Sequence, residues 1–166
     1  MKDLPDFVLN KEYENYYLLD DQQEAEIRDQ IFYFSSRIGG KEILVDIRNL
    51  AVSEEYKQYQ FTRLVVSPGA KLDLFKNKVD DRFYLDSFVG HYYLNDDTNL
   101  WEFYYSALTS LCIFACNNEV KDIYEEIFNP YEENTIKQKL DFLFLMVDEK
   151  RKNEFVEKLY ENYHWK

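Results

Sequence analysis

Two cysteines at a spacing of four residues are the first groups in this sequence that could do chemistry. Cys112 and Cys116 would lie on one face of a helix, where a thiol pair could bind a metal ion or undergo redox exchange. A metal site would need further ligands, and the chain has only two histidines, His91 and His164. We therefore interpret both cysteines as small buried apolar residues, reduced in a cytosolic protein.

The histidines belong to patterns that could support catalysis. Glu161 and His164 form E-x-x-H, but a di-iron helical bundle needs two such motifs and this sequence has one. His91 lies near Asp86 and Ser87 and could be imagined as a general base or triad member, although no spacing requires it. The motifs G-x-S-x-G, H-E-x-x-H and S-x-x-K do not occur. We therefore expect a structural role for His91, and no catalytic residue, metal ligand or cofactor.

Acidic side chains are concentrated in one third of the chain. The net charge is −12, from 32 acidic and 20 basic residues, which disfavours nonspecific binding to nucleic acid or to an anionic membrane. Residues 80–133 hold 12 acids and two bases, net −10, whereas residues 1–79 carry −3 and residues 134–166 carry +1. Concentrated like charge destabilises a fold through self-repulsion, and a basic partner would relieve it.

Tyrosines are interleaved with these acids. Tyrosine provides a large rigid contact area, and carboxylates accept hydrogen bonds from arginine and lysine, so the combination suits a protein-binding surface. The alternative is a solvated face that keeps the protein soluble. The predicted partner-binding residues are Asp80, Asp81, Tyr92, Tyr93, Asp96, Asp97, Glu102, Asp122, Glu125, Glu126, Tyr131, Glu132 and Glu133.

Apolar residues recur at spacings of three and four along most of the chain, which predicts helices. One stripe runs over residues 101–115, with Asn99 as its N-cap, Glu102 as a capping-box partner, and Leu108 and Leu111 in the core. Further stripes predict helices at residues 25–37, 72–83, 85–92, 120–127, 136–147 and 155–163.

The positions 42–66 contain β-branched segments that could be helix or strand, and periodicity does not decide between them. We predict a mainly α protein, a single-domain bundle of seven to nine helices over residues 1–166. The alternative is an α+β fold with a small sheet from residues 42–66.

The location expected from the sequence is the cytoplasm. The first ten residues, MKDLPDFVLN, contain no apolar run of signal-peptide length. The longest uncharged run, Phe103 to Asn118, has 16 residues and is too short and too polar to span a bilayer.

The part 84–134 resembles the helical PoNi-type family of bacterial immunity proteins, which neutralise polymorphic toxins delivered by neighbouring cells. It contains the sequence FVGHYYLNDDTNLWEFYYSALTSLCIFACNNEVKDIYEEIFNP. The shared pattern is an aromatic-rich segment that leads into a buried helix with a Trp-Glu pair, here Trp101-Glu102, followed by an acidic connection. This chain departs from the family pattern where Tyr104 and Tyr105 replace the repeated alanines, and it is shorter than that family. The resemblance implies a helical, non-enzymatic inhibitor.

Three functions are compatible with these features. The first is an immunity protein, monomeric before complex formation, that binds a basic toxin domain of the nuclease class through its acidic, tyrosine-rich surface. The second is a phage or plasmid anti-defence protein that mimics nucleic acid. The third is a metal-dependent hydrolase that uses carboxylates. A hydrolase would need three or four acids converging in a cleft, whereas an inhibitor would spread them over a convex face.

Overall fold

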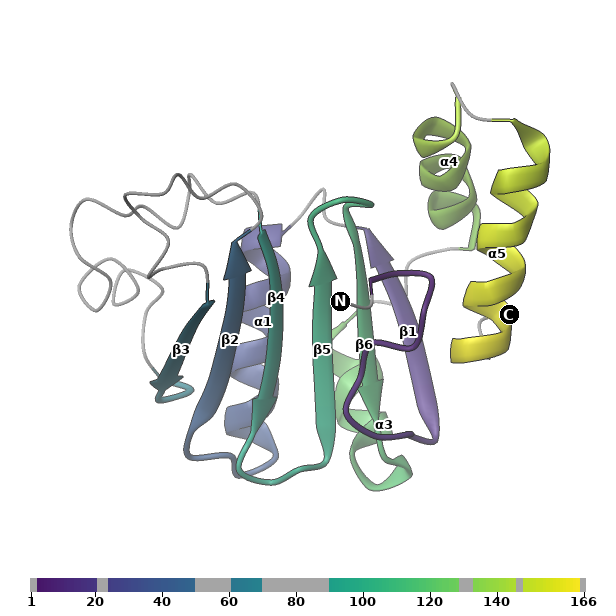
Figure 1. Cartoon of the computed structure of the whole chain (residues 1–166). Coiled ribbons are helices and arrows are strands. Elements are labelled where there is room, and N and C mark those ends of the chain that lie inside the picture. The colour runs from purple at the N-terminus through teal and green to yellow at the C-terminus, as the bar shows by residue number, and fades with distance from the viewer. Residues whose placement is uncertain are drawn as a thin grey trace, which may run out of the picture.

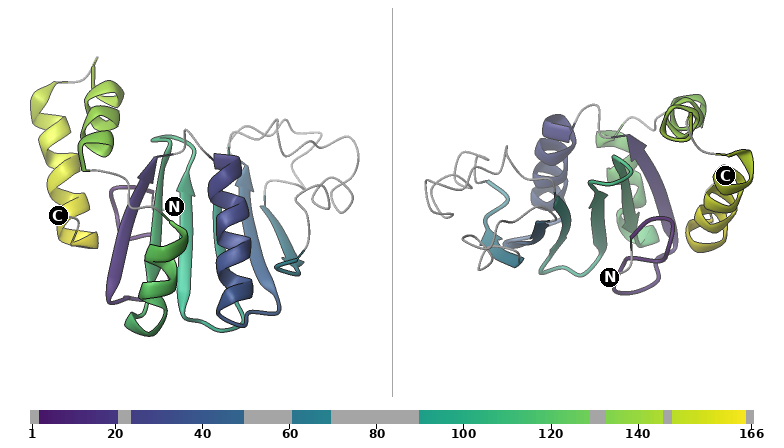
Figure 2. Two further views of the ribbon diagram at one scale, coloured as in Figure 1. Left: turned by 180° about the vertical axis from the view of Figure 1, so that it is seen from behind. Right: turned by 45° about the horizontal axis from the view of Figure 1, so that its top comes forward.

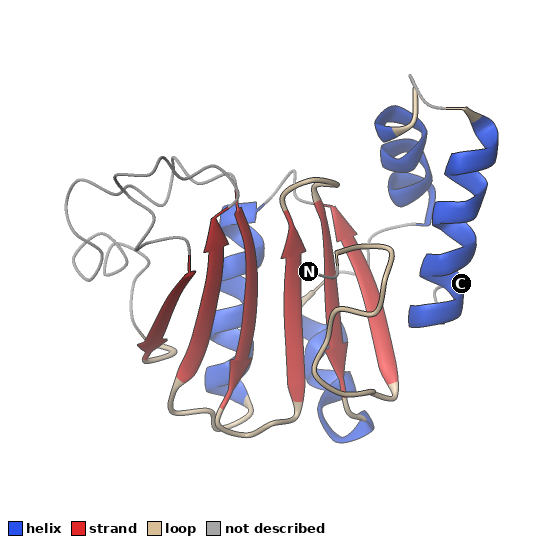
Figure 3. Cartoon of the chain, in the orientation of Figure 1, coloured by secondary structure: helices blue, strands red, loops and turns tan. Residues whose placement is uncertain are grey.

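The computed structural model describes residues 3–20, 24–49, 61–69, 90–128, 133–145 and 148–164. In this part of the chain, strands form one antiparallel sheet and helices flank it (Figure 3). The strands are β1 (Asn15–Asp20), β2 (Ile43–Asn49), β3 (Phe61–Val66), β4 (Gly90–Asp96), β5 (Trp101–Ser106) and β6 (Leu111–Cys116). The helices are α1 (Glu24–Arg37), α3 (Asn118–Ile127), α4 (Glu133–Leu143) and α5 (Glu149–Tyr163).

The sheet has the order β1-β6-β5-β4-β2-β3, so the first strand of the chain pairs with the last. Strands β4, β5 and β6 follow one another as a meander, and every neighbouring pair is antiparallel. The register places Tyr17 opposite Phe114 and Val45 opposite Leu94, so apolar residues from adjacent strands share one face.

Helices α1 and α3 cover one face of the sheet, as the view from behind shows (Figure 2). The core under them is aromatic: Phe114 stacks on Trp101 with ring centroids 5.7 Å apart and on Tyr124 at 4.3 Å. Phe34 of α1 meets Phe114 edge-on at 5.3 Å. These large rings account for much of the apolar area buried on this side.

On the opposite face, the N-terminal segment, residues 3–14, runs over β1 and β6, and α4 and α5 stand beside the edge strand β1 (Figure 1). Leu140 and Leu159 of these helices belong to the same buried cluster as Leu18 and Ile113 of the strands. The Tyr163 hydroxyl accepts from the Val8 N–H at 3.0 Å and donates to the Asp6 carbonyl at 2.7 Å. The two ends of the described chain are thus bonded together.

The prediction of a mainly α bundle of seven to nine helices is wrong, because the protein is α+β with a six-stranded antiparallel sheet. The alternative of a small sheet from residues 42–66 was closer, since β2 and β3 lie in that region. That alternative still missed the four other strands, so it underestimated the sheet.

The predicted helix over residues 101–115 is the β5–β6 hairpin. Both strands are buried on both faces, so their sequences show no alternation of apolar and polar residues. In such a run, spacings of three and four arise without a helix. Asn99 and Ser110 have positive φ angles of 56° and 53° in the turns, so Asn99 is a turn residue and not a helix cap.

Four helix predictions are confirmed, at α1, α3, α4 and α5, where one face is apolar and the other polar. The segment predicted as a helix at 85–92 is wrong from Gly90 onward, where β4 begins. Its first part and the helix predicted at 72–83 lie outside the described residues. In the described part of the chain, no helix combines the length and apolarity that crossing a membrane requires.

The two leucines of the hairpin give a direct test of this fold. Leu111 is fully buried at 0% exposure, as predicted, whereas Leu108 is 67% exposed in the turn, so its predicted place in the core is wrong. We predict that Leu111→Ala lowers the free energy of unfolding by roughly 2–5 kcal/mol. Leu108→Ala, the matched control, should change it by less than about 0.5 kcal/mol. Urea denaturation of both variants measures this, and equal losses would favour the helical interpretation.

Candidate functional site

Among the residues that the structure describes, the predicted partner-binding residues do not form one surface. Asp80, Asp81, Tyr131 and Glu132 lie outside the described residues, and Glu133 is the first residue of α4. The remaining residues are divided between the sheet, the β4–β5 turn and helix α3.

Asp96 is a buried carboxylate with internal partners. It is 4% exposed and accepts hydrogen bonds from Ser35 Oγ at 2.6 Å, from the Thr98 N–H at 2.9 Å and from Thr98 Oγ1. Gly40 packs directly on this pair, since a Cβ there would lie 2.5 Å from Asp96 Oδ2. Asp96 therefore holds the end of β4 against α1 and offers no surface to a partner.

Glu102 is also buried, at 3% exposure, on the face of the sheet opposite α1 and α3. It accepts a hydrogen bond from the Asn10 N–H at 2.9 Å, which ties the N-terminal segment to β5. Burial and the Glu102 carboxylate raise the pKa of Tyr93 well above its usual value. Glu102 is thus an internal hydrogen-bond acceptor.

The two tyrosines of β4 point to opposite faces of the sheet, as neighbours on a strand must. Tyr92 stacks on Tyr105 at 4.6 Å on the side of α1 and α3. Tyr93 lies on the other side, where its hydroxyl accepts from Asn10 Nδ2. No single binding surface can use both rings.

Asp97 is exposed in the turn after β4 and accepts from the N–H groups of Lys41 at 2.8 Å and Glu42 at 3.2 Å. These hydrogen bonds favour the ionised form and lower the pKa of Asp97. Asp97 therefore carries its charge at the surface while it fixes the chain between α1 and β2.

Helix α3 carries three more exposed acids of the predicted set, Asp122, Glu125 and Glu126. Glu119, Asp122 and Glu126 stand at i, i+3 and i+7, which places them along one ridge of the helix. All three are exposed, and the buried residues Val120 and Tyr124 lie on the opposite side against the sheet. We call Glu119, Asp122, Glu125 and Glu126 the acidic face of α3. Glu125, also exposed, lies beside this ridge.

The acidic face of α3 is joined to α1 by one ion pair. Arg37 donates to both carboxylate oxygens of Glu126 at 3.2 Å, and this lowers the pKa of Glu126. The Arg37 guanidinium also lies 5.7 Å from the ring centre of Tyr33, which is exposed. An exposed tyrosine therefore adjoins the exposed carboxylates, the combination expected of a protein-binding surface.

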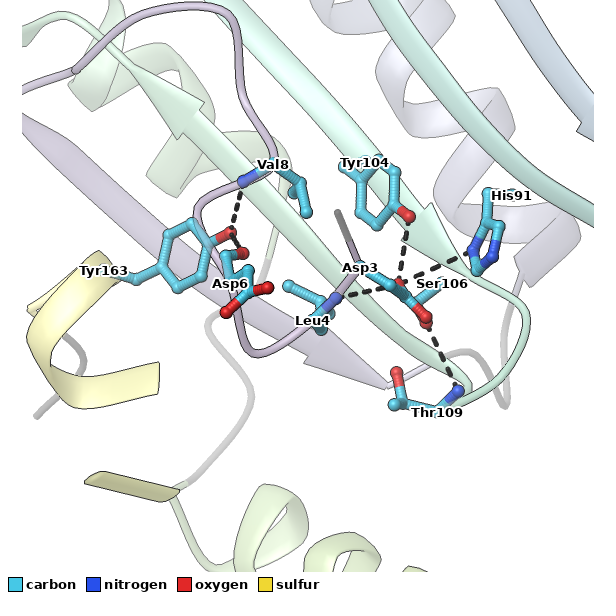
Figure 4. Close-up of polar contacts among 9 residues, drawn as sticks. All are labelled: Asp3, Leu4, Asp6, Val8, His91, Tyr104, Ser106, Thr109 and Tyr163. Carbon is cyan, nitrogen blue, oxygen red and sulfur yellow. Dashed lines mark hydrogen bonds and ion pairs between the residues drawn. The ribbon is translucent and has the colours of Figure 1, made fainter. Parts of the chain in front are cut away.

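His91 belongs to a polar cluster on the other face of the sheet (Figure 4). It is 3% exposed in β4 and stacks on Tyr104 at 5.9 Å. Its Nδ1 lies 3.6 Å from Asp3 Oδ1, the oxygen to which the Tyr104 hydroxyl donates at 3.0 Å. His91 was predicted to lie in a helix at 85–92, which is wrong, because it stands on the strand β4.

Two opposing effects act on the pKa of His91. Burial lowers it, and the Asp3 carboxylate raises it, with a further lowering from Arg48. Burial dominates because the imidazole is almost fully enclosed and does not reach hydrogen-bonding distance of Asp3. His91 is therefore neutral at pH 7, in a position that links Asp3 of the N-terminal segment to the sheet.

Cys112 and Cys116 are both buried on β6, so the prediction that they are buried is confirmed, whereas the predicted helix is wrong. Burial raises the pKa of Cys116 to about 12, which keeps the thiol protonated. Within the described ranges, no group of three or more His, Cys, Asp or Glu side chains is placed to hold a metal ion.

Sequence reasoning missed the arginines and acids that lie on the same face of the sheet as His91. Arg48 and Asp46 lie on β2, Arg63 on β3, and Asp3 in the N-terminal segment, and none was singled out. The available signal was the alternation of apolar and charged residues in ILVDIRN, which is typical of a strand with one polar face.

Comparison with protein-family models, with curated proteins and with solved structures gave no match.

The pH dependence of folding tests the state of His91. The pKa of His91 is lower in the folded protein than in the unfolded chain, so the unfolded chain binds the proton more readily. Neutral His91 therefore contributes its full stability above about pH 6.5, and this contribution is lost as the pH falls below that value. We predict that the wild type loses stability relative to His91→Gln between pH 7.5 and pH 5. Parallel chemical denaturations would show this, and a wild type that gains stability in acid would mean that the Asp3 pair dominates.

Proposed function

We propose that this protein is a non-catalytic immunity-type inhibitor that binds a basic protein partner, a toxin domain of the nuclease class, through the acidic face of α3. The partner would meet it inside the cell that makes it. The observation that carries this proposal is the position of the exposed carboxylates, which lie along the outer side of a helix and not around a cleft.

The charge of α3 supports this proposal. The helix has four acids and one base, Lys121, which lies 3.6 Å from Glu125. Arg37 is bonded to Glu126, and no other cation of the described residues is ion-paired with the acidic face of α3. A basic partner would relieve the repulsion among these carboxylates and would associate faster because of long-range attraction.

The hydrolase alternative finds less support in the geometry. Buried Asp96 and Glu102 are held by hydrogen bonds from main-chain and side-chain donors of the same chain. A carboxylate that is satisfied internally in this way is not poised to hold a metal ion or a water nucleophile. The exposed acids are separated along a convex helix, which suits contact with a second protein.

Charge reversal on the acidic face of α3 is the test. We expect that the full-length chain, used as bait in a lysate of the source organism, captures a basic protein at low salt. The double variant Asp122→Lys/Glu126→Lys should lose this protein, because each reversal at a desolvated pair costs roughly 2–5 kcal/mol. With the purified pair, binding should weaken as salt rises, since exposed charges are screened within about 10 Å at 0.1 M.

The matched control is Glu154→Lys/Glu157→Lys, two exposed acids on α5 that change the net charge equally. It should retain the partner. Equal loss with the control, or an affinity that does not change with salt, would show that the acidic face of α3 is not the contact. A captured DNA-binding host protein in place of a toxin would favour the nucleic-acid mimic.

A further inference from the structure

A cleft of about 430 Å³ lies on the face of the sheet opposite α1 and α3, away from the acidic face of α3. Its described lining comes from four adjacent strands, β3, β2, β4 and β5. The side chains of this face that line it are Asp46, Arg48, Phe61, Arg63, His91, Tyr93 and Tyr104. A volume of this size is typical of sites for small molecules.

The charge of this lining is unlike that of the chain as a whole. Two arginines and one aspartate line it, and the Asp3 carboxylate lies beside it, 3.6 Å from Nδ1 of His91, in a protein whose net charge is −12. Arg63 is neutralised by Asp46, to which it donates two hydrogen bonds of 2.6 and 2.7 Å. Arg48 is not paired with any carboxylate among the described residues, so it is the cation of the cleft that an anionic ligand would contact.

Buried nitrogen atoms in the cleft have unused hydrogen-bonding capacity. Nε of Arg48 is buried without a hydrogen-bond partner, and Nδ1 of His91, which faces Asp3 Oδ1 at 3.6 Å, also makes no hydrogen bond. A buried polar group without a partner destabilises the fold, and a ligand that supplies an acceptor to Arg48 would relieve this. The guanidinium fork of arginine matches carboxylate and phosphate oxygens in particular.

Aromatic rings form the rest of the cleft. The Arg48 guanidinium lies 5.3 Å from the ring centre of Phe61, and Phe61 itself is 64% exposed on the edge strand β3. Tyr104 and His91 stack on each other on the neighbouring strands. A flat ligand could lie on such rings while its anionic group contacts Arg48.

We infer that this cleft is a binding site for a small planar ligand that carries a carboxylate or a phosphate. Arg48 binds the anionic group and the exposed ring of Phe61 contacts the planar part. The Asp46–Arg63 pair lies beside them, two residues along β2 and β3 on the same face. The site is independent of the partner-binding function proposed for the acidic face of α3, because it lies on the other side of the sheet.

Titration of the full-length chain with three probes tests this inference. We expect phenyl phosphate or benzoate to bind with a Kd of about 1 mM or below, and inorganic phosphate, which lacks the ring, to bind at least about tenfold more weakly. The better of the two aromatic probes identifies the anion, phosphate or carboxylate. Calorimetry and amide chemical shifts in β2 and β3 are the measurements.

Two pairs of variants locate the binding. Arg48→Gln should weaken the binding of the aromatic probe at least about tenfold. The control Arg151→Gln, at an exposed arginine of α5, should leave this binding unchanged. Phe61→Ala should weaken the binding of both aromatic probes. The control Phe142→Ala, at a similarly exposed ring of α4, should leave their binding unchanged. Unfolding curves confirm that each variant is folded.

Three results would overturn the inference. The first is no binding of either aromatic probe below about 10 mM. The second is equal binding of inorganic phosphate and phenyl phosphate, which would remove the role of the rings. The third is unchanged binding in a folded Arg48→Gln variant, which would place the anion elsewhere.

Discussion

Strands β5 and β6 are buried on both faces, and this constraint organises the rest of the protein. All six residues of β6 are buried, so apolar side chains project from both sides of the sheet at its centre. A sheet with two apolar faces must be covered twice. Helices α1 and α3 provide one cover, and the N-terminal segment together with α4 and α5 provides the other.

The second cover is held by polar contacts as well as by apolar packing. Asp3 accepts from Tyr104, Glu102 accepts from the Asn10 N–H, and Tyr163 bonds to the main chain at Val8. Because these groups are buried or half-buried, each bond also prevents the cost of an unsatisfied polar atom. The same contacts bring Asp3 next to His91, so the cover also completes the polar cluster at that position.

The acidic character of the chain therefore has two origins. Asp96 and Glu102 are internal acceptors that fix strands to neighbouring segments, whereas the acidic face of α3 is exposed on the outer side of a helix. On the opposite side of the sheet, Arg48 lines the cleft without an ion-paired carboxylate among the described residues. The two proposed binding surfaces carry different charged residues because they lie on different layers of the fold. A net charge summed over a stretch of sequence does not show this difference.

The sequence by itself determined the four helices that are amphipathic, the burial of both cysteines and the concentration of acids, because each follows from a local pattern of residue types. It did not determine that residues 101–116 form a hairpin, since a strand buried on both faces shows no alternation that separates it from a buried helix. It also did not determine which acids are exposed. Glu102 and Glu125 are the same residue type in the same acidic region, and only the tertiary structure buries the first beneath the N-terminal segment and leaves the second on the surface of α3.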